Sequence, residues 1–126
     1  MRKFFLVATA AVSMFAMGCP SPESVCQTKA ETACKKVFEC TPDAVKASDA
    51  FKAGYGANVD ECQGKQEAAL KCGTIENYDE LCNDGTNNGK EYQLGKASDC
   101  SDQVLEMACA DFNTGKRPDV CAQVCK

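Results

Sequence analysis

The stretch PESVCQTKAETACKKVFEC, residues 22–40, decides the fold of this chain. Its small, apolar and cysteine side chains recur every three or four residues, which is the spacing of one face of an α-helix. We therefore expect a helix over Pro22–Cys40, opened by a capping box between Ser24 and Gln27. Because cysteines occupy its inward face, we expect disulfides to tie this helix to its neighbours. The inward face comprises Cys26, Ala30, Ala33, Cys34 and Val37.

The chain holds few residues that can build a large apolar core. Leu, Ile, Val, Met and Phe supply 16 of the 108 residues from Cys19 onward, and Trp is absent. Chains with less than about 20% of such residues often fail to fold unaided, and small exported domains make up the deficit with disulfides. The sequence predicts a small all-α, disulfide-stapled domain of four or five helices with irregular loops.

Two further helices are expected directly after the first one. The apolar pattern and the turn residues predict a helix over about 42–52, with Val45 on its inward face. Another is predicted over about 58–72, with Leu70 turned inward and Gly73 as its C-terminal cap.

The second half of the chain is expected to contain more loop. Residues 73–97 are predicted to be mostly loop. Within them, Asp84–Gly89 has the residue types of a calcium-binding EF-hand loop at positions 1, 3, 5 and 6 of that loop. Position 12 of that loop requires a bidentate Glu, and the residue here is Gly95, so a turn is the better interpretation. A helix over about 98–110 and a short one from Pro118 complete the predicted fold.

Ten cysteines are expected to close five disulfides. Cys26 and Cys34 are 8 residues apart, and Cys62 and Cys72 are 10 apart. In an antiparallel pair of helices these spacings fit Cys26–Cys72 and Cys34–Cys62. The other pairings stay open, because ten cysteines allow roughly 945 arrangements. The ten are Cys26, Cys34, Cys40, Cys62, Cys72, Cys82, Cys100, Cys109, Cys121 and Cys125.

The start of the chain has the pattern of an export signal. Residues 1–3 are Met-Arg-Lys, a short basic stretch, and residues 4–17 carry no charge. A basic start followed by 7–15 apolar residues is typical of a secretory signal peptide, and a membrane span needs roughly 20. We expect 1–18 to be a signal peptide, 19–23 a lipidated tether and 24–126 the disulfide-rich helical domain.

Residues 16–20, AMGCP, resemble the lipobox of bacterial lipoprotein signal peptides through Gly18 and Cys19, although the two residues before them depart from the usual pattern. The resemblance implies that Cys19 carries lipid on its sulfur and begins the processed protein. It also implies outer-membrane sorting, because Pro20 follows the cysteine. A lipidated Cys19 explains why the number of cysteines, 11, is odd. The alternative is ordinary cleavage, with Cys19 in a disulfide.

The layout is also similar to small cysteine-rich envelope lipoproteins of predatory and social Gram-negative bacteria. Those proteins start with Gly-Cys, continue with helices that carry paired cysteines, and have a late P-x-x-C-x-x-x-C segment, here residues 118–125. That group has no general activity, so the resemblance implies a location rather than a function.

Charge narrows the range of partners. The chain has 14 basic and 18 acidic side chains, and without residues 1–18 it has 12 and 18, a net charge of −6. This balance disfavours nucleic acid, which requires clustered Lys and Arg. A membrane is the expected partner through lipid on Cys19, since two or more acyl chains anchor a protein stably.

No catalytic, cofactor-binding or metal-binding residue is expected. Histidine is absent, which removes the commonest general base and Cys/His zinc sites, and there is no C-x-x-C redox motif. We expect a non-enzymatic structural or binding role in the bacterial cell envelope, with a protein or glycan partner at loops 74–97 and 111–118. The specific activity stays open. An alternative is a disulfide-braced protease inhibitor that offers Lys116 or Arg117 from the loop 113–118.

Overall fold

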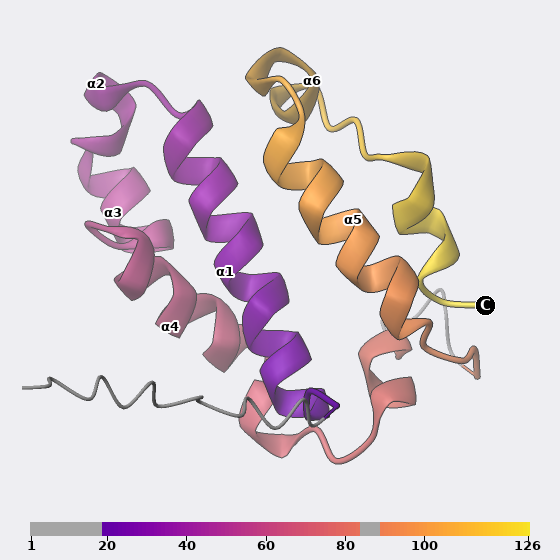
Figure 1. The fold of residues 1–126 in the computed structure, drawn as a ribbon. Helices are drawn as coiled ribbons and strands as arrows, with labels where there is room; N and C mark the ends of the chain where they lie inside the picture. The colour runs from indigo at the N-terminus through magenta and orange to yellow at the C-terminus, as the bar shows by residue number, and fades with distance from the viewer. Residues whose placement is uncertain (1–18, 84–88) are drawn as a thin grey trace, which may run out of the picture.

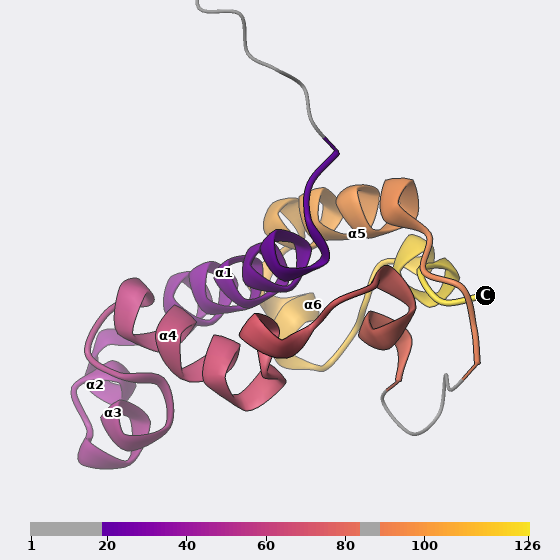
Figure 2. The same cartoon turned by 90° about the horizontal axis from the view of Figure 1, so that it is seen from below.

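The computed structural model describes residues 19–83 and 89–126 and shows an all-α domain built around one long helix, α1 (Figure 1). Helix α1 lies between α4 and α5 in both views (Figures 1 and 2). The described residues hold no β-strand, so the predicted all-α, disulfide-stapled class is confirmed. The elements are α1 (Pro22–Cys40), α2 (Asp43–Lys46), α3 (Asp49–Tyr55), α4 (Val59–Leu70), η1 (Cys72–Thr74), η2 (Tyr78–Cys82), α5 (Leu94–Glu106), α6 (Cys109–Asn113) and η3 (Asp119–Gln123).

The described part of the chain holds six α-helices, more than the four or five expected, because two predicted helices are each divided. The 42–52 segment forms α2 and α3, and the hydroxyl of Ser48 accepts a hydrogen bond from the Phe51 amide (3.2 Å) to begin the second of them. The 98–110 segment is divided by extended backbone at Met107 (ψ 150°), where α5 ends and α6 follows. Local backbone geometry, with a side-chain cap in the first case, therefore overrides the longer apolar pattern.

Helix α1 has the bounds that the sequence predicts, but its N-cap is Ser21 and not a box that begins at Ser24. The Ser21 hydroxyl accepts a hydrogen bond from the Ser24 amide (3.1 Å). Pro22 occupies the first turn, where no backbone donor is required. The helix ends two residues before Pro42, because a proline disfavours helical backbone in the residue that precedes it.

Two disulfides hold α4 antiparallel against α1. Cys26 is bonded to Cys72 and Cys34 to Cys62, with Cα–Cα distances of 5.5 Å and 5.8 Å. Both are the pairs that the helix spacing predicts. The two bridges fix the register of the hairpin, because each joins one end of the shared face. The remaining disulfides are Cys40–Cys109, Cys82–Cys125 and Cys100–Cys121.

The buried core consists mainly of disulfide sulfur. Val45 and Leu70, which the sequence placed inward, are 48% and 40% exposed. The bridge at Cys62 determines which face of α4 turns inward, and Leu70 lies eight residues later, rotated by about 80° from that face. The buried apolar residues are Cys26, Ala30, Cys34, Cys40, Phe51, Cys62, Cys72, Cys82 and Val104.

Three lysines donate to carbonyl oxygens in the last turns of neighbouring helices. These carbonyls have no intrahelical donor and carry partial negative charge, so a nearby ammonium group stabilises them. Lys36 is the most deeply placed, with 1% of its surface exposed between α1 and α5. Each contact ties one helix to another. The pairs are Lys36 with Leu105 (3.0 Å), Lys46 with Phe38 (3.1 Å) and Lys65 with Ala53 (3.2 Å).

The molecule has two distinct ends along the axis of α1 (Figure 1). We call the end with residues 19–21, residues 70–82 and the isolated Tyr92–Cys125 bridge the tether end. The far end holds α2, α3, α6 and the loop 113–118 (Figures 1 and 2). At 1.5 Å per residue, the 19 residues of α1 separate the two ends by about 28 Å.

Candidate functional site

Cys19 differs from every other cysteine of the chain. It is exposed and has no disulfide partner, whereas the ten cysteines that follow it all pair within the chain. All eleven lie among the described residues. The alternative in which Cys19 closes an intrachain disulfide therefore finds no partner in the structure. A single exposed thiol remains for chemistry or attachment.

The segment between Cys19 and the folded domain is short. The sequence predicts a tether over 19–23, but Pro22 and Glu23 already belong to α1. The backbone carbonyl of Pro20 accepts a hydrogen bond from the Tyr78 hydroxyl of η2. Position 19 is thus held close to the surface of the domain, with one residue between it and the cap of α1.

Tyr78 belongs to a stacked pair of tyrosines at the tether end. The rings of Tyr78 and Tyr92 have centroids 6.1 Å apart and planes within 7°. The Tyr92 amide donates to Asp79 Oδ1 (3.0 Å), and its neighbour Gln93 donates to the Val124 carbonyl (2.7 Å). Burial, with a smaller contribution from Tyr78, raises the pKa of Tyr92 to about 12. The start and the end of the described chain therefore meet at this pair.

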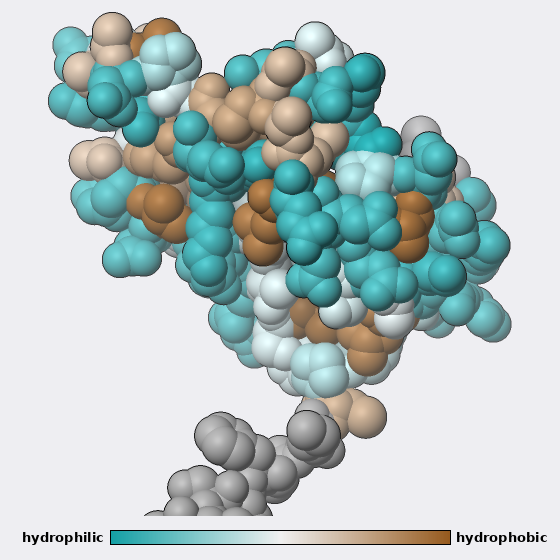
Figure 3. Space-filling model, turned by 45° about the horizontal axis from the view of Figure 1, so that its top comes forward, coloured by the Kyte–Doolittle hydropathy of each residue, from teal (hydrophilic) through white to brown (hydrophobic). Residues whose placement is uncertain are grey.

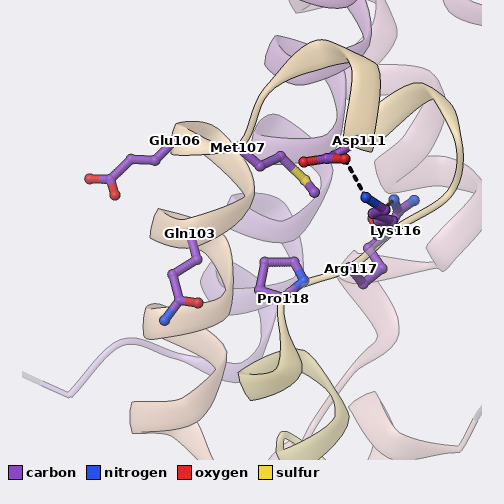
Figure 4. A pocket seen from close by; sticks show the side chains of 7 residues that line it. All are labelled: Gln103, Glu106, Met107, Asp111, Lys116, Arg117 and Pro118. Atoms are coloured by element: carbon purple, nitrogen blue, oxygen red, sulfur yellow. Dashed lines mark hydrogen bonds and ion pairs between the residues drawn. The ribbon is translucent and has the colours of Figure 1, made fainter.

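A hollow of about 380 Å³ lies at the far end (Figure 4). Lys116 is paired with Asp111 (2.6 Å), and the Arg117 guanidinium lies over the Phe112 ring, 5.1 Å from its centroid. The Gly115 amide donates to the Phe112 carbonyl (3.0 Å), which closes the loop on itself. Figure 4 shows Met107 reaching toward Asp111 across the hollow. The lining residues are Gln103, Glu106, Met107, Asp111, Lys116, Arg117 and Pro118.

The loops at which a partner is expected lie at different ends of the molecule. The described part of 74–97 contains η2 and the Tyr92 contacts at the tether end, whereas 111–118 borders the far-end hollow. The turn at Asp84–Gly89 falls mostly on 84–88, outside the described residues. The structure therefore does not join the two loops into one surface.

Among the described residues, the grouping of possible metal ligands consists of Glu39, Cys40 and Cys109. The two sulfurs are bonded to each other, so neither is a thiolate that can coordinate a metal. Of the described helices, none has both the length and the apolar character to cross a membrane.

Sequence reasoning missed two features that shape these sites. The sequence pattern does not single out Lys36, because a lysine carries no apolar signal. Its role depends on the Leu105 carbonyl, 69 residues away. The contact of Tyr78 with Pro20 spans 58 residues and likewise leaves no local pattern.

Comparison with known proteins assigns no role to these residues. The chain matches no family model, no curated protein and no solved structure. The functional argument therefore rests on the geometry of this chain, above all on the isolated Cys19 at the tether end.

Proposed function

We propose that this chain is an exported protein of the bacterial cell envelope, anchored by lipid on Cys19 and sorted to the outer membrane. Its helical domain has a non-enzymatic structural or binding role. The observation that carries the proposal is that Cys19 alone among eleven cysteines is unpaired and exposed, directly before α1. A lipidated cysteine needs both properties, since its sulfur must be free and accessible to the modifying enzyme.

The disulfides support an exported location. Five bridges are compatible with an oxidising compartment outside the cytoplasm, where such bonds form and persist. They also give a small domain with little apolar core the stability it needs. The disulfides are thus compatible with an exported protein. The lipid anchor and the outer-membrane location are the further parts of the proposal.

The position of the far-end hollow supports a binding role. An anchor at Cys19 places the tether end next to the membrane, and α1 then holds the loop 113–118 about 28 Å further out. The hollow combines apolar and charged groups, with Met107 at its side and the Lys116–Asp111 pair at its rim. A protein or glycan partner would reach this surface without obstruction by the membrane.

No observation favours the alternative function of a protease inhibitor. An inhibitory loop has to extend a basic side chain freely into the specificity pocket of the protease. Here Lys116 is paired with Asp111, and Arg117 lies on Phe112 and donates to the Lys116 carbonyl (2.8 Å). We therefore propose a single function.

The test is the intact mass of the chain purified from membranes of a Gram-negative host. We expect a protein that begins at Cys19 and carries diacylglyceryl and acyl groups, with ten thiols that react only after reduction. Cys19→Ser is the matched control, because it removes the attachment atom and leaves the five disulfides intact. A chain without lipid, or one that enters the membrane fraction equally well with Ser at position 19, would overturn the proposal.

A further inference from the structure

Three aliphatic side chains with partial exposure lie together at the tether end. Leu70, at the end of α4, is 40% exposed, and Ile75 and Leu81 are half-buried beside it. Figure 3 shows hydrophobic residues at the lower end of the molecule, bordered by hydrophilic ones. The three aliphatic residues line a groove of about 130 Å³, which we call the tether-end groove. Its full lining is Cys26, Lys29, Leu70, Ile75, Glu80, Leu81 and Asn83.

The tether-end groove is fixed in place beside the attachment residue. Cys26, which lines the groove, lies near the beginning of α1 and is bonded to Cys72, with a Cα–Cα distance of 5.5 Å. Tyr78, three residues after Ile75, donates its hydroxyl to the Pro20 carbonyl. A group attached to Cys19 therefore leaves the domain at the same end as the groove.

We propose that the tether-end groove and its aliphatic rim dock on the lipid bilayer, with Leu70, Ile75 and Leu81 at the boundary between headgroups and acyl chains. The inference rests on the proposed function, since it takes Cys19 to be the point of membrane attachment. It adds that the aliphatic rim makes direct contact with the bilayer, which a lipid anchor by itself does not require.

The short attachment is the reason for choosing a bilayer as the occupant. After the proposed processing only Cys19, Pro20 and Ser21 precede α1, and three residues span at most about 10 Å even when fully extended. The contact of Pro20 with Tyr78 shortens this reach further. The headgroup layer is itself about 5–7 Å thick on each side of a bilayer. A domain attached through so short a segment contacts the membrane interface with the end that carries the attachment.

The chemistry of the tether end suits a lipid interface. Aliphatic side chains gain by leaving water for the acyl boundary, and tyrosines favour the headgroup level because they combine an apolar ring with a hydroxyl. Lys29 and Lys71 can extend their ammonium groups toward the headgroups. Glu76, Asp79 and Glu80 outnumber these two lysines, so we expect docking on zwitterionic lipid without a requirement for anionic lipid.

The absence of tryptophan from the chain allows a site-specific test. Leu70→Trp places a fluorophore at the tether end, and Val45→Trp places one at the far end, where the replaced side chain is similarly exposed, at 48%. Both variants of the full chain are purified from host membranes and reconstituted into phosphatidylcholine vesicles that carry bromine, a quencher, on the acyl chains next to the headgroup. Circular dichroism before reconstitution checks that each variant is folded, and Ile75→Trp serves as a second probe of the tether end.

We expect bromine to quench the fluorescence of Leu70→Trp by about half or more, and that of Val45→Trp by almost nothing, because interfacial side chains reach about 5–10 Å into the acyl boundary. Equal quenching of both variants, or none in either tether-end probe, would overturn the inference. A blue-shifted but unquenched Leu70→Trp would also overturn it, since a protein surface would then cover the groove.

Failure of the anchor and failure of docking are distinguishable. Flotation of the vesicles reports attachment, and quenching reports orientation. If the chain proves to lack lipid, the Cys19 thiol is coupled to a maleimide-bearing lipid in the same vesicles, and the quenching of the two variants is compared again. This comparison tests membrane contact of the groove independently of the natural modification of Cys19.

Discussion

Removal of the Cys40–Cys109 disulfide should separate the two halves of the domain at the far end. Among the disulfides of the described chain, it is the one that joins α1 to α6. Its neighbours across the same interface are the hydrogen bond from Asn113 to the Cys40 carbonyl (3.3 Å) and the contact of Lys36 with Leu105. We consider the double variant Cys40→Ala/Cys109→Ala.

The expected loss follows from the loop that the bond closes. Cys40 and Cys109 are 69 residues apart, and the dependence of unfolded-chain entropy on loop length gives about 4.4 kcal/mol at 25 °C. The other four bridges shorten the effective loop, so this value is an upper bound. For Cys100–Cys121, with a separation of 21, the same relation gives about 3.3 kcal/mol. Either loss is a large part of a total stability of about 5–15 kcal/mol.

Chemical denaturation of the oxidised proteins measures both losses. We expect Cys40→Ala/Cys109→Ala to lose more unfolding free energy than the matched control, Cys100→Ala/Cys121→Ala. Hydrogen exchange should show faster opening of α6 in the first variant, because α6 then loses its covalent link to α1 and keeps the hydrogen bond from Asn113 to the Cys40 carbonyl. A loss below about 1 kcal/mol, or a larger loss in the control, would refute loop closure as the main source of stability.

Three further predictions concern single side chains. Lys36→Ala leaves the Leu105 carbonyl without its donor and opens a cavity, so denaturation should show a loss of about 3 kcal/mol in unfolding free energy. Lys36→Met keeps the side-chain volume, so its loss should be smaller. Gly56→Ala should lower the melting temperature, because φ is +82° and the new Cβ would lie 2.6 Å from a glutamate Cβ. The control Gly54→Ala, in α3 with open space around it, should raise the free energy of unfolding by up to about 1 kcal/mol. Burial raises the pKa of Tyr92 to about 12, so the folded state holds the phenol proton more tightly than the unfolded state. The free energy of unfolding should therefore fall as the pH rises from about 10 to 12. Denaturation experiments at several pH values should show that Tyr92→Phe removes this fall.

Helix α1 shows how far local sequence signals reach. Its periodicity predicts the helix and the proline that follows it predicts the end. The structure has the same bounds, although Ser21 and not a box at Ser24 caps the start. The end of α4 was predicted less well. Lys71, with a left-handed backbone (φ 55°), caps the helix in place of Gly73. A lysine in that conformation is uncommon, and the adjacent Cys72, which is bonded to α1, holds the chain there.

The candidate site was predicted in part. The sequence singles out Cys19, and the structure adds that it has no partner and that Tyr78 holds the residue next to it. The loop 113–118 was predicted as a loop, but its internal ion pair was not, because Lys116 and Asp111 carry no signal that they would meet. Charged side chains on a surface have many possible partners, and only the turn of the backbone selects one.

The sequence by itself determined the helical class, the full length of α1 and the two bridges to α4, because periodicity and cysteine spacing act within one helix or one hairpin. Only the tertiary structure decided the other three disulfides and the burial of Lys36. Two of those bridges, Cys40–Cys109 and Cys82–Cys125, join residues 69 and 43 positions apart, and their pairing depends on how α5 packs beside α1. Such contacts arise from the packing of whole helices, which no local pattern of residues encodes.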